Sequence, residues 1–139
     1  MLKLLAVLFA AALAFGFVFL NSGLPLAAPT LAAQSSEGGG VNVVVTPKAL
    51  GPGVAVWEFE VVMDTHSKPL DEDIPQAAVL VDEVGRRYKP TAWQGDPPGG
   101  HHRSGILQFS APADMPEAVE LQIEGIGEAG TRTFRWELK

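Results

Sequence analysis

The stretch Ala55-Val56-Trp57-Glu58-Phe59-Glu60-Val61-Val62-Met63 decides the fold of this chain, because large apolar residues fall on every second position. Side chains of a β-strand point alternately to its two faces. One face would carry the apolar row Trp57, Phe59, Val61 and Met63, and the other would carry Glu58 and Glu60. The stretch therefore predicts a strand that is buried on one side.

Similar short stretches, separated by Gly, Pro and Asp clusters, lie on both sides of this strand. The predicted strands are 41–46, 55–63, 77–82, 86–89, 105–110, 119–124 and 132–138. Together they predict an all-β fold, an immunoglobulin-like antiparallel sandwich of about seven strands, with a small Greek-key barrel as the alternative. The expected core is Trp57, Phe59, Phe109, Leu121, Phe134 and Trp136. A single turn of helix is expected over 114–118, and Gly85 is expected at a positive φ in a hairpin.

The N-terminal part has a different character. After Lys3, the run Leu4 to Leu20 contains no charged or polar side chain, which predicts one N-terminal hydrophobic helix. We interpret residues 1–24 as a signal peptide or an N-terminal membrane anchor, 25–40 as a flexible linker and 41–139 as the sandwich domain. Cleavage by signal peptidase near Ala33 would leave a mature start near Gln34. In either case the positive charge of Lys3 predicts an extracytoplasmic domain: periplasmic, secreted, or anchored and facing outward.

Composition excludes several kinds of function. The chain has 139 residues, 16 acidic and 10 basic side chains, a net charge of −6 and no cysteine. Without cysteine there is no disulfide framework, thiolate metal site or cysteine nucleophile. The net negative charge disfavours nucleic acid, since binding to phosphates needs a basic patch.

All three histidines lie in two short segments, 63–67 and 99–105, and these are the candidate site. Imidazole with carboxylate suits copper or zinc, so the predicted metal ligands are His66, His101, His102 and Asp64. His101 and His102 are adjacent and would point to opposite faces of an extended chain. Both could reach one ion only if Gly99-Gly100 turns the backbone.

Two other interpretations of these segments stay open. In a purely structural one, Asp64, Thr65 and Ser67 organise a turn. Arg103 pairs with Asp64, and His66 stacks on a tryptophan such as Trp93 or donates to a backbone carbonyl. In the other, the segments recognise an anionic or protein partner. An enzyme is not expected, because no nucleophile elbow surrounds the serines beside the histidines and the acidic run 71–73 forms no cleft.

The series Asp64-Thr65-His66-Ser67, then Gly99-Gly100-His101-His102-Arg103, resembles a group of uncharacterised secreted bacterial β-sandwich domains with Thr-His-Ser and Gly-Gly-His-His-Arg motifs. More distantly, the chain is similar to small periplasmic copper-handling sandwiches, although it lacks their methionine-rich motifs. The resemblance implies export and a sandwich fold.

The leading hypothesis is an exported, non-enzymatic sandwich that binds copper or zinc through His66 with His101 or His102, while Asp64 is a ligand or orients an imidazole. The alternative is an accessory or protein-interaction subunit of a membrane complex, held at the membrane by residues 4–20, in which the histidine loops are structural.

Overall fold

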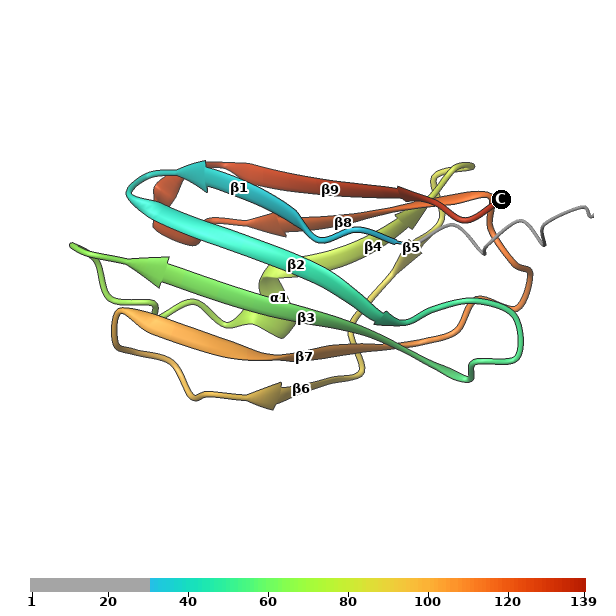
Figure 1. Ribbon diagram of the computed structural model, residues 1–139, viewed down its shortest axis with the longest axis horizontal. Coiled ribbons are helices and arrows are strands. Elements are labelled where there is room, and N and C mark those ends of the chain that lie inside the picture. Colours follow the sequence, from blue (N-terminus) through green and yellow to red (C-terminus); the bar gives the residue numbers. More distant parts are fainter. Residues whose placement is uncertain (1–30) are drawn as a thin grey trace, which may run out of the picture.

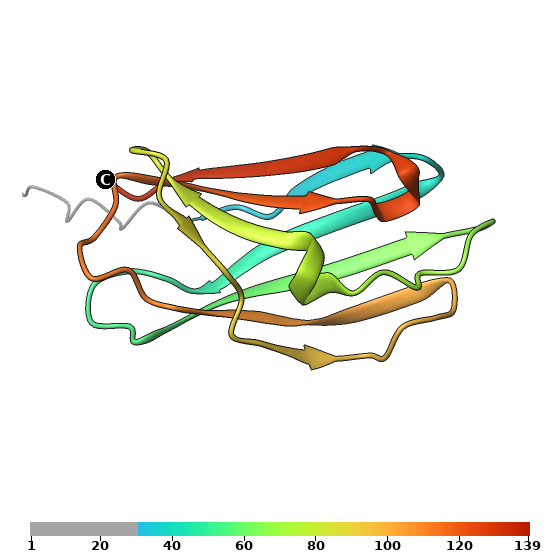
Figure 2. The same ribbon diagram turned by 180° about the vertical axis from the view of Figure 1, so that it is seen from behind.

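The computed structural model describes residues 31–139, which form two antiparallel sheets packed face to face (Figures 1 and 2). The five-stranded sheet contains, in spatial order, β1 (Gln34–Gly38), β2 (Val41–Ala49), β3 (Val56–Thr65), β7 (His102–Ser110) and β6 (Ala92–Gly95). The four-stranded sheet contains β5 (Arg87–Tyr88), β4 (Ala78–Asp82), β8 (Ala118–Glu124) and β9 (Thr131–Glu137). The predicted all-β antiparallel sandwich is confirmed.

The core lies between the two sheets and follows the alternation seen in the sequence. All six aromatic and aliphatic residues expected there are at most 4% exposed. Phe59 contacts Phe109 edge-on, with ring centroids 5.7 Å apart, and lies 5.4 Å from the ring of Trp136 across the sandwich. Burial of such side chains contributes about 1.5–3 kcal/mol each, which explains how a domain without disulfides holds together.

Two strands, β1 and β6, were not predicted from the sequence. β1 falls within residues 25–40, so the predicted flexible linker is wrong for Gln34–Gly38. β6 surrounds Trp93 and forms an outer edge of the five-stranded sheet. Neither strand has an apolar row of its own, and both pair with a longer neighbour.

The short helices also differ from the expectation. The predicted turn of helix over 114–118 is wrong: residues 114–117 contain none, and Ala118 begins β8. Instead, α1 (Ile74–Ala77) follows the loop after β3, and η1 (Ile126–Glu128) joins β8 to β9. The side chain of Asp73 caps α1 by accepting from the N–H of Gln76 at 3.3 Å.

Pro47 does not end its strand as the sequence suggested. β2 continues to Ala49, and its register against β3 shifts between Pro47 and Ala49. Proline cannot donate to a sheet ladder, so an irregularity at this position is where a strand can accommodate it.

The hairpin between β4 and β5 is organised by one buried carboxylate. Asp82 accepts from the N–H groups of Val84 and Arg86 at 3.1 and 2.8 Å and from the hydroxyl of Tyr88 at 3.1 Å. Gly85 has φ of 87°, which confirms the predicted positive φ. Burial, followed by the hydrogen bond to Asp82, raises the pKa of Tyr88.

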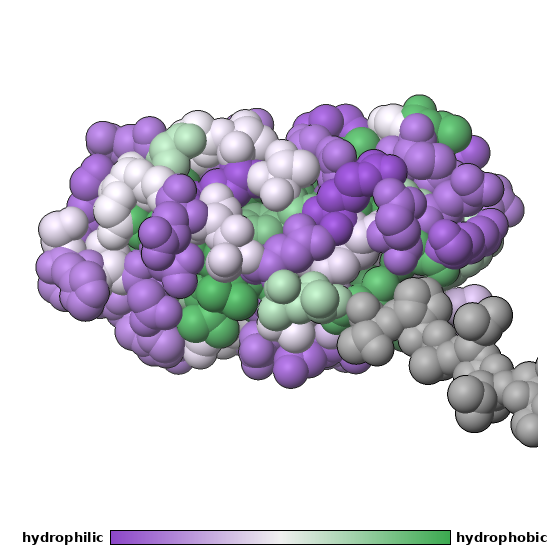
Figure 3. All heavy atoms as spheres, turned by 45° about the horizontal axis from the view of Figure 1, so that its top comes forward, coloured by the Kyte–Doolittle hydropathy of each residue, from purple (hydrophilic) through white to green (hydrophobic). Residues whose placement is uncertain are grey.

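The surface is mostly polar. Figure 3 shows hydrophilic side chains over much of one face, with apolar residues in small separate patches. No helix within residues 31–139 is long and apolar enough to cross a membrane. The apolar run Leu4 to Leu20, predicted to be a signal or an anchor, lies outside the described residues.

Candidate functional site

Both histidine segments lie at the same end of the sandwich, where β3 ends and β7 begins (Figure 1). Backbone hydrogen bonds join the two loops: the N–H of Thr65 donates to the carbonyl of His101 at 2.9 Å, and that of Leu70 donates to the carbonyl of Gly100 at 3.0 Å. The N–H of Gly99 in turn donates to the carbonyl of Leu70 at 2.8 Å. The two segments, separated by about thirty residues in sequence, therefore form one joined unit.

Thr65 connects this unit to a third loop. Its hydroxyl donates to the carbonyl of Gly40, in the β1–β2 turn, at 2.8 Å. The same oxygen accepts from the N–H groups of Ser67 and Lys68, both at 3.3 Å. Thr65 thus organises the turn after β3, as the structural interpretation of the Thr-His-Ser motif expected.

Asp64 and His102 are cross-strand neighbours on the outer face of the five-stranded sheet. Nδ1 of His102 lies 2.5 Å from Oδ1 of Asp64, and both side chains are more than half exposed. The hydrogen bond and the charge of Asp64 raise the pKa of His102. Because Asp64 engages Nδ1, the nitrogen that remains for a ligand is Nε2.

Arg103 points the other way, because successive side chains of a strand alternate between faces. It is only 2% exposed and donates to the backbone carbonyls of Glu72, Asp96 and Leu70 at 2.6, 3.1 and 3.3 Å. Its guanidinium carbon lies 5.4 Å from the ring centroid of Trp93. The expected Arg103–Asp64 pair is therefore wrong: His102 takes the place beside Asp64, and Arg103 lies over Trp93.

The four predicted metal ligands are thus only partly brought together. Asp64 contacts His102 directly, and Asp64 and His66 line one pocket. The side chain of His101 is exposed, and its carbonyl serves the loop. Within residues 31–139, no group of three or more His, Asp or Glu side chains is arranged to hold a metal ion.

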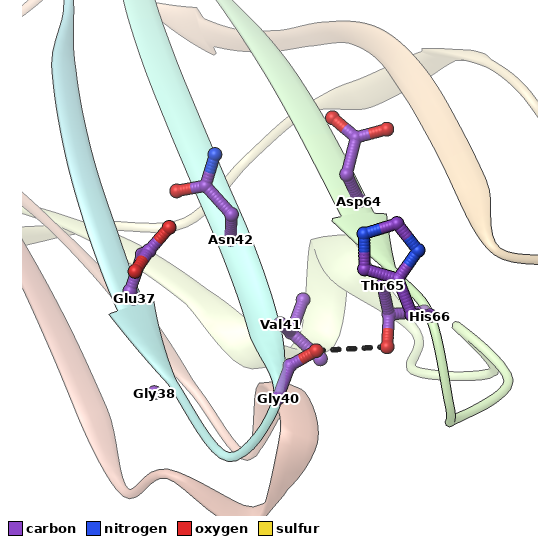
Figure 4. Close-up of a pocket in the computed structure, with 8 residues that line it drawn as sticks. All are labelled: Glu37, Gly38, Gly40, Val41, Asn42, Asp64, Thr65 and His66. Carbon is purple, nitrogen blue, oxygen red and sulfur yellow. Dashed lines mark hydrogen bonds between the residues drawn. The ribbon is translucent and has the colours of Figure 1, made fainter.

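The pocket is an open hollow of about 600 Å³ at the ends of β1, β2 and β3 (Figure 4). Among residues 31–139, no lysine or arginine lines it. The residues that line it are Glu37, Gly38, Gly40, Val41, Asn42, Asp64, Thr65 and His66.

A row of polar side chains crosses four strands at this pocket. Glu37 pairs in register with Asn42, Asn42 with Asp64, and Asp64 with His102. We call these four residues the polar row. Neighbouring strands lie about 4.8 Å apart, so the row extends over roughly 14 Å.

Acceptor atoms dominate the polar row. It holds two carboxylates and the amide oxygen of Asn42, and that Oδ1 is buried with no hydrogen-bond partner among residues 31–139. His102 is the one member that can carry a positive charge. The row and the pocket therefore suit a donor with a positive charge.

Neither Glu37 nor Asn42 was among the site residues predicted from the sequence. Glu37 lies between Ser36 and three glycines, a composition typical of linkers. Asn42 did carry a signal, because it is the single polar residue within Val41–Val45 and so marks an outward position of that strand.

Comparisons with known proteins show no family for this chain. No protein-family model matches it, and no curated protein matches it. It is similar to the crystal structure of a DUF4426 family protein from Pseudomonas aeruginosa PAO1, with 19% sequence identity, a TM-score of 0.48, and coverage of 76% of this chain and 93% of that chain. The comparisons give no support to the resemblance to copper-handling sandwiches.

Proposed function

We propose that the protein is an exported, non-enzymatic binding domain whose polar row and pocket bind a positively charged group of a partner protein. The observation that carries the proposal is the row of Glu37, Asn42 and Asp64 along a pocket without lysine or arginine. Carboxylate and amide oxygens accept hydrogen bonds from the ammonium of lysine and the guanidinium of arginine. The overall charge of −6 would also attract a basic partner.

The pocket is open, so we expect a transient interaction that depends on salt. Exposed ion pairs contribute little individually, and salt screens them. Asp64 raises the pKa of His102. The protonated ring of His102 therefore competes with a cationic partner for the carboxylate of Asp64. Binding of a cationic partner should therefore weaken as the pH falls through the pKa of His102.

The test is an NMR titration of the full chain in detergent with a short arginine-rich peptide and a lysine-rich one. We expect shifts confined to the pocket residues, an affinity that falls with added salt, and loss of binding in the double variant Glu37→Gln/Asp64→Asn. Glu58→Gln is the matched control, since Glu58 lies on the same strand as Asp64 but outside the pocket. Shifts spread over the whole surface, or equal weakening by Glu58→Gln, would reject the proposal.

A second candidate function is binding of copper or zinc, favoured by the contact between Asp64 and His102. Histidines that bind metals commonly donate their other ring N–H to a carboxylate, which fixes the ring. In this proposal Nε2 of His102 is a ligand, Asp64 orients the ring, and His66 or His101 is a further ligand. Water or a partner protein would complete the coordination.

Titration with copper(II) and zinc at pH 7.5 tests this candidate. Micromolar binding that is lost in His102→Gln, and weakened in Asp64→Asn, would support it. Binding that is unchanged in His102→Gln, or absent at micromolar concentrations, would reject the metal site while leaving the peptide experiment to decide the first proposal.

A further inference from the structure

The residues just before β1 take part in the folded domain. The carbonyl of Ala32 accepts a hydrogen bond from Nε1 of Trp136 at 2.8 Å. The ring of Trp136 is 4% exposed and belongs to the core. Leu31 packs against the same core. These contacts join residues separated by about a hundred positions in sequence, so they are tertiary structure and not local turns.

β1 continues this attachment along β9. The side chain of Gln34 accepts from the N–H of Arg135 at 3.0 Å and donates to the carbonyl of the same residue. Gln34 thereby satisfies both backbone groups of Arg135, as a neighbouring strand would. Arg132 donates to the carbonyls of Ser36 and Gly38 at 2.6 and 2.7 Å. We call this set of contacts between residues 31–38 and β9 the seam.

We infer that the folded domain begins before Gln34, and that a protease removing the N-terminal apolar run must cut before Leu31 if the mature protein is to keep the seam. The inference rests on the proposed export of the chain. A cut between Ala33 and Gln34 would remove Leu31 from the core. It would also remove the carbonyl of Ala32, which accepts the hydrogen bond from Nε1 of Trp136.

The position of this boundary also determines which end of the domain lies nearest to the N-terminal part of the chain. The chain enters the sandwich at Ala32, beside the end of β9, and reaches the pocket at Gly38. Six residues of extended chain span about 20 Å. Leu31 and Ala32 thus lie at one end of the sandwich, with the pocket at the opposite end.

Elastase, which cuts after small residues, tests the inference on the purified full chain in detergent. Sites are available both before the boundary, after Ala27, and beyond it, after Ala32 and Ala33. We expect the resistant fragment to begin at or before Leu31. A fragment that begins at Ala32 or later would overturn the inference.

Two tryptophan variants test whether the hydrogen bond between Trp136 and Ala32 protects the start of the seam from cleavage. In Trp136→Phe, cutting after Ala32 and Ala33 should rise about tenfold relative to other sites, as loss of one partly buried hydrogen bond predicts. Trp57→Phe is the matched control, because Nε1 of Trp57 is buried with no hydrogen-bond partner among residues 31–139. Equal effects of the two variants on the cuts after Ala32 and Ala33 would contradict the role of the Ala32 contact.

The N-terminus of the protein recovered from an exporting bacterial host gives a second readout. A start produced by cleavage at or before Leu31 supports the inference, and a start at Ala32 or later overturns it. Recovery of the chain in the cytoplasm would count against export, and so against the proposed function, while the elastase boundary would still decide the inference.

Discussion

At the scale of single residues, the Gly-Gly-His-His-Arg motif contains one side chain that points to the surface and one that points into the domain, and the two make different contacts. His102 pairs with Asp64 at the surface, whereas Arg103, one position later, is buried among carbonyl groups of two loops. Arginine remains charged when buried, so several carbonyl dipoles must take the place of water around it. The Gly-Gly-His-His-Arg motif thus combines a surface pair with a structural cation.

The pair gives a pH-dependent prediction. A raised pKa in the folded state means that the pair stabilises the protein below the unfolded histidine value of about 6.5 and loses this effect as the pH rises through the folded pKa. Asp64→Asn should lower the pKa of His102, as measured by NMR titration of its ring. The same variant should reduce the free energy of unfolding more at pH 6 than at pH 8.5.

The control for this prediction is Asp114→Asn. Asp114 is exposed and pairs with Arg86, and it follows the end of β7 opposite to His102. It should leave the titration of His102 unchanged. A His102 pKa that is identical in the wild type and in Asp64→Asn would contradict the prediction.

At the scale of elements, β6 can pair with β7 because Gly105 has no side chain. A Cβ at Gly105 would lie 2.6 Å from Cζ2 of Trp93 and 2.8 Å from the Cα of Gly95. The ring of Trp93 takes that space and also lies beside Arg103. One glycine therefore places the edge strand and the aromatic partner of a buried cation together.

We expect Gly105→Ala to displace Trp93 and to destabilise the domain by about 1–3 kcal/mol, as overpacking usually does. Chemical denaturation measures the loss, and tryptophan fluorescence reports the displaced ring. Ser104→Ala, on the opposite face of the same strand, is the control and should change stability by less than about 0.5 kcal/mol. Equal losses in the two variants would show that Gly105 has no special role.

The elements also show what the sequence could predict. Apolar alternation sufficed for β3 and β9, because Trp57, Phe59, Phe134 and Trp136 bury themselves through it. It could not find β1, whose Gln-Ser-Ser-Glu-Gly sequence is held by side chains of β9 from the other end of the chain. The candidate site was also predicted only in part. Its histidines and Asp64 were identified from the sequence, whereas the pairing of β1, β2 and β3 places Glu37 and Asn42 beside Asp64.

At the scale of the whole molecule, Arg132 holds three parts together. It is 3% exposed and donates to carbonyls of Ser36 and Gly38 in β1 and of Ile126 in η1. Burial lowers its pKa, and the charge of Glu72 opposes that shift. β1 and β9 belong to different sheets, so Arg132 closes one side of the sandwich.

Arg132→Lys should therefore destabilise the domain although it keeps the charge. An ammonium group cannot present the planar fork that reaches all three carbonyls, and we expect a loss of about 2 kcal/mol in urea denaturation. Arg135→Lys is the control on the same strand, because the half-exposed side chain of Arg135 makes only solvent-accessible ion pairs with Glu120 and Glu137. A loss in Arg135→Lys as large as that in Arg132→Lys would contradict this role.

The bond between Ala32 and Trp136 has a practical consequence for attaching the molecule to a surface. Lys139 lies three residues beyond Trp136, beside the start of β1 and at the opposite end of the sandwich from the ends of β1 and β3, which carry Glu37 and Asp64 (Figure 1). A biotin or fluorophore coupled through a C-terminal tag would leave the pocket facing the solution. Immobilised molecules would then present the pocket as an outward-facing anchored domain would.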